Sequence, residues 1–265
     1  MSLTARWLGQ AGFLLSSGDD HLLMDPYLSD SLAKKYAGKP FPHTRMVPAP
    51  VAIEDLPPLL AVTCSHAHTD HMDPDTLEPL MLAQPDVRLV CPRADVGEAL
   101  SRSAAEPDRL DALGDRDRRT FGPFTVTALP SAHEEREIDL LGDDRFLGYV
   151  VRTPSATIYH SGDCVPWDGL ADRVKAEGAD IALLPVNGRD ARRTENGVPG
   201  NFSFAEAVDL CHQAGIRTLV PHHWGMFDFN SADPATFDLA HAADAGVRVV
   251  VPKHGQDLDL TGLVA

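Results

Sequence analysis

The sequence is poor in features that would place it outside the reducing cytoplasm. It has only four cysteines, none in a CxxC pair, and they are Cys64, Cys91, Cys164 and Cys211. Disulfide scaffolds and zinc knuckles repeat cysteines at short spacings, so neither is indicated. No apolar run approaches the roughly 18 residues of a membrane span, and the N-terminal residues lack the basic and apolar regions of a secretory signal. We therefore expect a cytoplasmic protein without membrane contacts.

Positive charge is also scarce. The 265 residues hold 23 Lys+Arg against 39 Asp+Glu, a formal net charge of −16. An acidic surface repels phosphate backbones, so no nucleic-acid partner is expected. With 43% hydrophobic residues and no long run of one charge, the chain can fold around a sizeable core, in two small domains or one larger one.

The pattern of apolar residues predicts alternating strands and helices after a strand-rich start. Short strands are expected at 4–8, 12–16 and 21–25, before a proline-rich irregular stretch at 27–58. A loop of this length suits a lid or an oligomer contact. Beyond it, strands are expected at 59–64, 87–91, 124–129, 148–152, 157–160, 181–186, 218–221 and 247–251, and helices at 76–83, 94–104, 169–177, 204–214 and 234–243. This alternation favours a layered α/β architecture.

Six of the apolar strands run directly into polar residues that can bind metals. The segments are AVTCSHAHTDH, TALPSAHEE, TIYHSGD, ALLPVNGRD, TLVPHHWG and VVVPKHG. Ligand sites in α/β sheets gather at strand ends, because loops there present side chains from a rigid base. The repetition predicts a single site assembled from several strand ends.

The segment at residues 66–71 carries the clearest chemistry. It places three histidines and an aspartate within six residues after an apolar strand, a set that is costly to bury without compensation. Zn²⁺, Mn²⁺ and iron accept imidazole and carboxylate ligands. Alternate residues of an extended segment face the same side, so His66 and His68 can chelate one ion. Asp70 and His71 follow closely enough to reach a second ion.

With its later SAHEE, HSGD and GNFSFAEA segments, this HxHxDH pattern resembles the metallo-β-lactamase superfamily. WLGQAGFLL and MDPYLSD are similar to the wider branch that contains the ascorbate-6-phosphate lactonases, and LPVNGRD and PHHWGMFDF are similar to the lactonase subgroup in particular. The resemblance implies one domain over residues 1–265, an αββα sandwich with metals at one edge of its two sheets. It implies His66, His68 and His133 on a first ion, Asp70 and His71 on a second, and Asp163 bridging both.

The sequence leaves the last metal ligand open among three histidines. The branch's Pro-x-His-aromatic-Gly pattern favours His223, in PHHWG. Other branches use a Pro-Gly-His-Gly-like turn, which PKHG imitates at His254. With His223 as the ligand, His222 and His254 are expected to support the ligands or contact substrate.

The implied activity is hydrolysis by a metal-bridged hydroxide, with Zn²⁺ or Mn²⁺ as the expected ions and iron also compatible. Asp70 is expected both to bind metal and to pass a proton to the leaving group. The resemblance implies a lactone of a phosphorylated sugar acid, such as ascorbate 6-phosphate, as substrate. The alternatives are a phosphodiesterase or nuclease, and an iron-dependent oxidoreductase.

An arginine-rich loop suggests that the substrate is a small anionic molecule. Arg189 in LPVNGRD is the favoured anion contact, with Asn187 and Asn201 beside it, because guanidinium groups bind phosphate and carboxylate through paired donors. Further candidates in the loops are Asp190, Arg192, Arg193, Lys34, Lys35 and Lys39. The other histidines are expected in the core (His160) or on the surface (His21, His43, His212 and His241), and Cys164 is expected to pack in the core. A homo-oligomer is expected from the resemblance.

Overall fold

The computed structural model describes residues 2–264 and contains two seven-stranded mixed sheets. The first sheet has the order β14-β1-β2-β3-β4-β5-β6, antiparallel from β14 to β3 and parallel from β3 to β6. Its strands are β1 (Leu3–Gly9), β2 (Gly12–Ser17), β3 (Asp20–Met24), β4 (Ala61–Thr63), β5 (Arg88–Pro92), β6 (Leu110–Leu113) and β14 (Asp257–Asp259).

The second sheet has the order β13-β12-β11-β10-β9-β8-β7 and is parallel from β10 to β13. Its strands are β7 (Arg118–Phe121), β8 (Phe124–Pro130), β9 (Leu147–Arg152), β10 (Thr157–His160), β11 (Ile181–Pro185), β12 (Thr218–His222) and β13 (Arg248–Val249). Because β10, β11 and β12 run in the same direction, their carboxyl ends meet at one edge, as do those of β3 and β4 in the first sheet.

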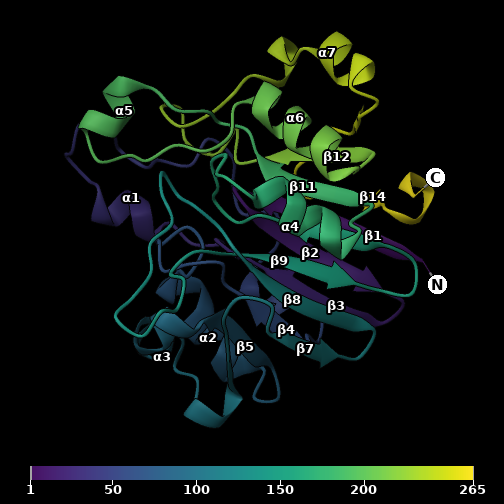
Figure 1. The fold of residues 1–265 in the computed structure, drawn as a ribbon. Helices are drawn as coiled ribbons and strands as arrows, with labels where there is room; N and C mark the ends of the chain where they lie inside the picture. The colour runs from purple at the N-terminus through teal and green to yellow at the C-terminus, as the bar shows by residue number, and fades with distance from the viewer. Residues whose placement is uncertain (1, 265) are drawn as a thin grey trace.

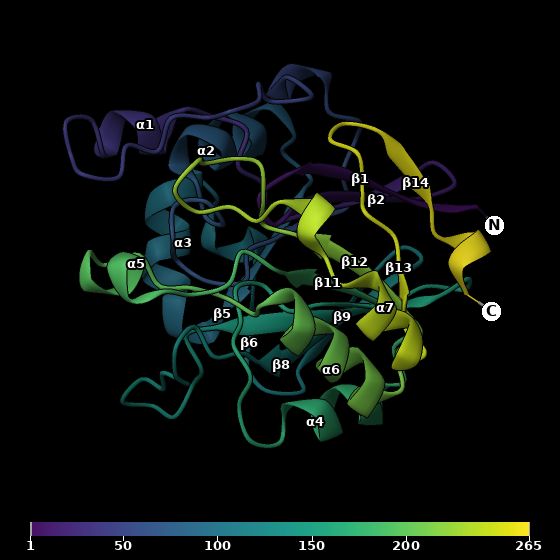
Figure 2. The ribbon, with the colours of Figure 1, turned by 90° about the horizontal axis from the view of Figure 1, so that it is seen from above.

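Helices cover the outer face of each sheet, which confirms the expected αββα sandwich (Figures 1 and 2). The helices are α1 (Ser31–Lys35), α2 (Pro74–Ala83), α3 (Val96–Ser103), α4 (Leu170–Glu177), α5 (Ala191–Glu195), α6 (Phe204–Ala214) and α7 (Leu239–Asp244). Short 3-10 turns lie at η1 (Ile53–Asp55), η2 (Arg93–Asp95), η3 (Pro107–Arg109), η4 (Pro234–Thr236) and η5 (Thr261–Leu263).

The three largest clusters of buried apolar residues match the layers of this sandwich. Phe13, Phe124 and Tyr149 belong to the central cluster between the sheets. A second cluster joins α4 and α6 to the sheet of β11 and β12, and a third joins α2 and α3 to the sheet of β4 and β5. Strands covered on both faces are buried throughout, which is why β11 shows a continuous apolar run instead of alternation.

Local signals in the sequence set the ends of α6. Ser203 accepts a hydrogen bond from the backbone N–H of Glu206, and the Glu206 carboxylate accepts one from the Ser203 N–H. This capping box satisfies donors that the first helical turn leaves free. Gly215 then ends the helix at a φ of 76°, a conformation that a residue without a Cβ adopts at little cost.

Several element boundaries predicted from the sequence were wrong, and some strands were not predicted. The expected helix at 234–243 is a 3-10 turn, η4, and a separate helix, α7, because the buried Phe237 between them is extended. The expected strand at 247–251 pairs only over β13. Strands β6, β7 and β14 were not predicted, since their mixed polar and apolar residues carry little periodic signal.

The long segment at residues 27–58 contains helix α1 and the turn η1 in an otherwise irregular path. All four cysteines are buried and unpaired. Residues 1 and 265 of the expected domain lie outside the described residues. Within residues 2–264, no helix has the length and apolar character needed to cross a bilayer.

Candidate metal centre

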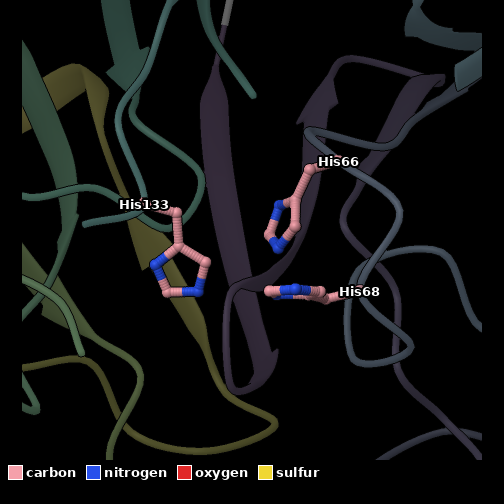
Figure 3. A group of neighbouring side chains, drawn as sticks. All are labelled: His66, His68 and His133. Atoms are coloured by element: carbon pink, nitrogen blue, oxygen red, sulfur yellow. The ribbon is translucent and has the colours of Figure 1, made fainter. Parts of the chain in front are cut away.

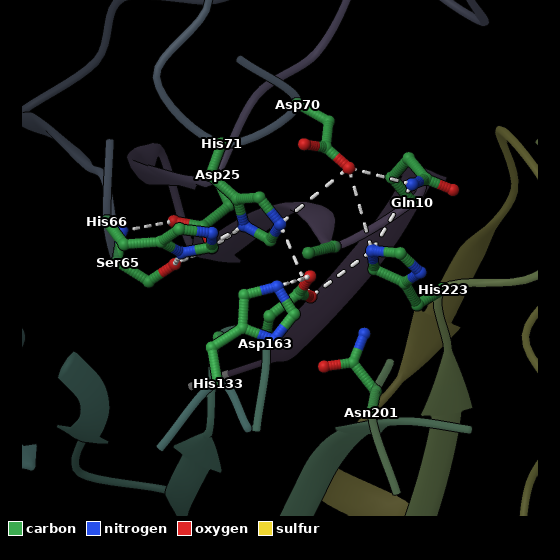
Figure 4. A network of polar contacts seen from close by, with 12 residues as sticks. Gln10, Asp25, Ser65, His66, Asp70, His71, His133, Asp163, Asn201 and His223 are labelled. Atoms are coloured by element: carbon green, nitrogen blue, oxygen red, sulfur yellow. Dashed lines mark hydrogen bonds and ion pairs between the residues drawn. The ribbon is translucent and has the colours of Figure 1, made fainter. Parts of the chain in front are cut away.

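Loops from both sheets bring the seven predicted ligands to one edge of the sandwich (Figures 3 and 4). The loop after β4 supplies the histidines and aspartate of residues 66–71. From the second sheet, the loops after β8, β10 and β12 supply His133, Asp163 and His223. The converging strand ends are therefore the physical reason that residues so distant in sequence meet.

His66, His68 and His133 form the first group, with their rings turned toward one another (Figure 3). Their ring centroids lie 4.6 Å apart between His66 and His68, 5.1 Å between His68 and His133, and 5.6 Å between His66 and His133. One nitrogen from each ring lies within 4.8 Å of the others, so three imidazoles can face one ion.

Asp70, His71 and His223 form the second group, and Asp163 lies between the two. The Oδ1 of Asp163 is 3.3 Å from His71 Nε2 and 3.2 Å from His223 Nε2. Its other oxygen, Oδ2, is 3.4 Å from His133 Nε2 in the first group. One carboxylate thus presents a separate oxygen to each group, the arrangement required of a bridging ligand.

The distances between these ligand atoms are close to those of metal coordination and lie at the long end of the range for hydrogen bonds. Two ligand atoms about 2.0–2.2 Å from a tetrahedral ion lie roughly 3.3–3.6 Å apart, and the separations around Asp163 are 3.2–3.4 Å. Three of these buried atoms, His66 Nε2, His71 Nε2 and Asp163 Oδ1, have no hydrogen-bond partner within the described chain. Buried polar atoms left unpaired are costly, and bound cations would satisfy them.

Electrostatics separates the two groups. Burial lowers the pKa of His133 to about 4 and that of His66 well below its ordinary value, so both rings are neutral donors. Burial also opposes charge on His223, but the carboxylates of Asp163 and Asp70 outweigh it and raise its pKa to about 9. The first group is therefore an uncharged set of nitrogen ligands, whereas the two carboxylates of the second favour positive charge beside them, which a proton on His223 or a bound cation supplies.

Two supporting residues were missed by the sequence reasoning, Asp25 and Gln10. Asp25 Oδ2 lies 2.6 Å from His71 Nδ1 and also accepts a hydrogen bond from the Ser65 hydroxyl. Gln10 Nε2 donates to Asp70 Oδ2. Asp25 carried a usable signal, because it directly follows the apolar β3 just as the ligands follow their own strands.

The structure brings His223 to the second group and places His254 elsewhere. His254 packs edge-on against Trp7, with ring centroids 5.9 Å apart, and lines a separate cavity with Trp224. His222 is fully buried and stacks on His160, with centroids 5.0 Å apart. Neither His222 nor His254 lines the cavity next to the ligand groups. His160 is buried in the core, as expected.

The two groups face a cavity of about 320 Å³. Metal-binding candidates on its wall include His68, Asp70, His133, Asp163 and His223. The segment at residues 27–58 supplies the opposite wall through Leu32, Lys35, Tyr36, Lys39, Pro40, Phe41 and His43. Two expectations change here: His43 is a half-buried wall residue stacked on Tyr36, and Lys34 pairs with Asp75 away from the cavity.

The favoured anion contact, Arg189, is not placed on the described cavity wall. Its guanidinium pairs with Glu206 of α6, Nη2 lying 2.5 Å from Oε1, and this ion pair uses the donors expected to bind substrate. Arg193 is likewise engaged, because it donates to Asn230 and to the Asn187 carbonyl. Groups from neighbouring segments satisfy both arginines, since Glu206 of α6 pairs with Arg189 and Asn230 from the loop after β12 accepts from Arg193.

Asn187 and Asn201 act within this buried amide network. Asn201 Nδ2 donates to Asn187 Oδ1, and Asn187 Nδ2 donates to Asn230 Oδ1. The side-chain oxygen Oδ1 of Asn201 accepts a hydrogen bond from the backbone N–H of Cys164, the residue after Asp163. The network thus supports the loop that carries Asp163, while Asn230 rather than Asn187 lines the cavity.

A model of the beta-lactamase superfamily domain matches residues 21–224, which include both ligand groups. Because this covers most of the chain, the protein belongs to this superfamily, the metallo-β-lactamase superfamily expected from the HxHxDH segment. One relative is a UPF0173 metal-dependent hydrolase of Methanosarcina mazei, 26% identical over 259 residues that span 97% of this chain and 99% of the relative.

Solved structures share the fold at lower identity. The isothiocyanate hydrolase from Delia radicum gut bacteria has a TM-score of 0.73 and 20% identity, covering 96% of this chain and 98% of that one. CmlA, a diiron β-hydroxylase from Streptomyces venezuelae, has a TM-score of 0.69 and 19% identity, covering 98% of this chain and 54% of that one. The same fold is therefore found in proteins of different activities.

Proposed function

We propose that the protein is a two-metal hydrolase that opens a small anionic substrate, with a lactone of a phosphorylated sugar acid as the first candidate. The observation that carries this proposal is Asp163, whose two oxygens face separate ligand groups at the base of one cavity. The name of the Methanosarcina mazei relative supports a metal-dependent hydrolase as the class.

Two divalent ions bound by these groups would supply a hydroxide near neutral pH and polarise the oxygen that gains charge. Asp70 lines the cavity, and its side chain keeps 18% exposure. It can therefore accept the proton of the attacking water and deliver it to the leaving oxygen. For a lactone, the water oxygen bonds to the carbonyl carbon, the ring C–O bond breaks, and the product is a hydroxy acid.

The opposite wall supports an anionic substrate. Lys35 and Lys39 both line the cavity, and Lys35 Nζ donates to Thr69 Oγ1, next to Asp70. In a chain with a net charge of −16, cations at this mouth favour ligands that carry phosphate or carboxylate. The rings of Tyr36, Phe41 and His43 give the same wall an apolar surface for the rest of the substrate.

A hydrolysis assay tests the proposal directly. Protein reconstituted with Zn²⁺ or Mn²⁺ is tested on phosphorylated lactones, plain lactones and phosphodiesters, with metal content measured on the same samples. We expect lactone hydrolysis that His68→Ala abolishes and that His21→Ala, a control at the other end of β3, retains. Turnover of phosphodiesters alone, or stoichiometric iron with oxygen consumption, would replace this function with one of the two alternatives.

A further inference from the structure

Gln10 is a fully buried polar residue in the tight turn that joins β1 to β2. We infer that its side-chain amide is a positioning group for the second metal ion, holding Asp70 beside His223. This inference rests on the proposed two-metal site. It adds a residue from the first hairpin to a centre otherwise built from the loops after β4, β8, β10 and β12 (Figure 4).

The amide contacts the atoms that would face the ion. Gln10 Nε2 is 2.9 Å from Asp70 Oδ2 and 3.2 Å from His223 Nε2. The same Asp70 oxygen is the one nearest the histidines, 3.6 Å from His223 Nε2 and 3.9 Å from His71 Nε2. A carboxylate oxygen can accept an N–H bond and bind a cation together, so the donated bond selects the Asp70 rotamer that binds metal.

The backbone of this turn is held in a conformation that favours glycine. Gln10 has a φ of 47° and His223 a φ of 64°, both in the left-handed region that residues with a side chain seldom occupy. The two are joined, because the His223 N–H donates to the Gln10 carbonyl at 3.0 Å. Strain of this kind persists where surrounding contacts impose it, and it is concentrated at functional sites.

Close packing fixes the turn against the segment that follows His223. The Trp7 indole N–H donates to the same Gln10 carbonyl at 2.9 Å. A Cβ on Gly9 would lie 2.2 Å from the Met226 Cε, so only glycine fits there without displacement of that side chain. The β1–β2 hairpin of the first sheet therefore packs against the loop after β12 of the second sheet. From this hairpin, the Gln10 side chain extends to the ligands Asp70 and His223.

Gln10 has no exposed surface, and the described cavity wall does not include it. It therefore acts through Asp70 and His223 and does not contact substrate. Loss of the amide should lower the affinity for the second ion and lower kcat. The KM for an anionic substrate, which depends on the opposite wall of the cavity, should change little. A purely structural role would instead lower stability without a selective effect on one ion.

Cobalt titration of the purified full chain separates these roles without using hydrolysis. Visible absorption follows Co²⁺ addition to wild type, Gln10→Met and Gln10→Gly, and thermal unfolding is recorded alongside. Both variants remove the side-chain amide. Methionine keeps about the same side-chain volume and the same unfavourable positive φ, whereas glycine adopts that φ at little cost. We expect two Co²⁺ in wild type, an unchanged first affinity in both variants, and a second affinity weaker by about 10–100-fold.

Gln84→Met is the matched control. The Gln84 side chain likewise joins two groups, but these are backbone groups at the end of α2: it accepts from the Leu59 N–H and donates to the Pro57 carbonyl. It should lose stability and keep both Co²⁺ affinities. If Gln10→Gly bound both Co²⁺ ions as tightly as wild type does, the inference would be overturned. If wild type bound only one Co²⁺, both the inference and the two-metal proposal would be overturned. Two Co²⁺ with the expected variant effect, but no lactone turnover, would support the inference and contradict the proposed function alone.

Discussion

The carboxylate of Asp25 orients the imidazole of His71 toward the metal centre. Asp25 Oδ2 lies 2.6 Å from His71 Nδ1, and neither side chain is exposed. The Ser65 N–H donates to Asp25 Oδ1 at 2.7 Å, so the carboxylate is itself held in place. Because Nδ1 is occupied by Asp25, the free Nε2 of His71 faces Asp163 and Asp70. Such carboxylate–histidine pairs fix the tautomer of a metal ligand and raise its basicity.

Replacing Asp25 by asparagine should lower the affinity of the protein for the second metal ion. The variant keeps the shape of the side chain but removes the charge that favours a proton on His71 Nδ1. We expect about 10–100-fold weaker binding of the second ion, measured by Co²⁺ titration. Asp19→Asn, in the exposed turn between β2 and β3, is the control. An unchanged second affinity in Asp25→Asn would show that the pair is not needed for metal binding.

The His66→Ala/His68→Ala double variant should lose metal without losing its fold. Both rings belong to the first group, while the apolar clusters that hold the sandwich together do not depend on them. Elemental analysis should show loss of the first ion, with far-ultraviolet circular dichroism close to that of wild type. Stoichiometric metal in the double variant would refute the ligand assignment.

Lysines on the cavity wall should affect anionic substrates selectively. Lys35→Ala and Lys39→Ala should each raise KM for a phosphorylated substrate by about fivefold, equivalent to roughly 1 kcal/mol, with less effect at high salt. Lys34→Ala is the matched control, since Lys34 precedes Lys35 on α1 but pairs with Asp75. Equal KM changes for an uncharged lactone would argue against a charge effect.

Stability should depend on pH through Asp95, which is remote from the metal ligands. Burial raises the pKa of Asp95 to about 6, although Arg145 lies 3.4 Å away and opposes the rise. The folded state thus holds the proton more tightly than the unfolded state. The contribution of Asp95 to the free energy of unfolding is complete below its ordinary pKa of 3.8 and is lost as the pH rises through about 6.

Asp95→Asn should therefore be more stable than wild type at pH 7–8, by about 1 kcal/mol after allowance for solvent screening, and equal to it below pH 4. Urea unfolding of metal-free protein from pH 4 to pH 8 measures the difference. Asp55→Asn, at an exposed position, should show no such trend. A constant difference across this range would contradict the role of Asp95.

The sequence predicted those features that depend on residue type and local order. Apolar runs that end in histidine or aspartate predicted both the strands and the edge at which their ends would meet. The four ligand positions within His66–His71 could be named from their closely spaced imidazole and carboxylate groups, whereas His133 and Asp163 were named through the resemblance to the metallo-β-lactamase superfamily. The sequence left the last ligand open among His222, His223 and His254, and the path of the chain after β12 brings His223 to the other ligands.

Interactions between distant segments were much harder to predict. Arg189 stands in a suggestive loop, but Glu206 takes up its donors once α6 is docked beside it. Gln10 carries no metal-binding signal, and its role arises only because a hairpin turn presses against the β12 loop. His43 looked like a surface residue until the segment at 27–58 folded over the cavity.

The sequence alone thus determined the class of fold and the chemistry of the ligands, because periodicity and side-chain type act over a few neighbouring residues. Tertiary structure alone decided which oxygens of Asp163 face which group, which side chains hold the ligands in place, and which cations face the cavity. These depend on the packing of the two sheets, which sets distances between residues that no local pattern connects.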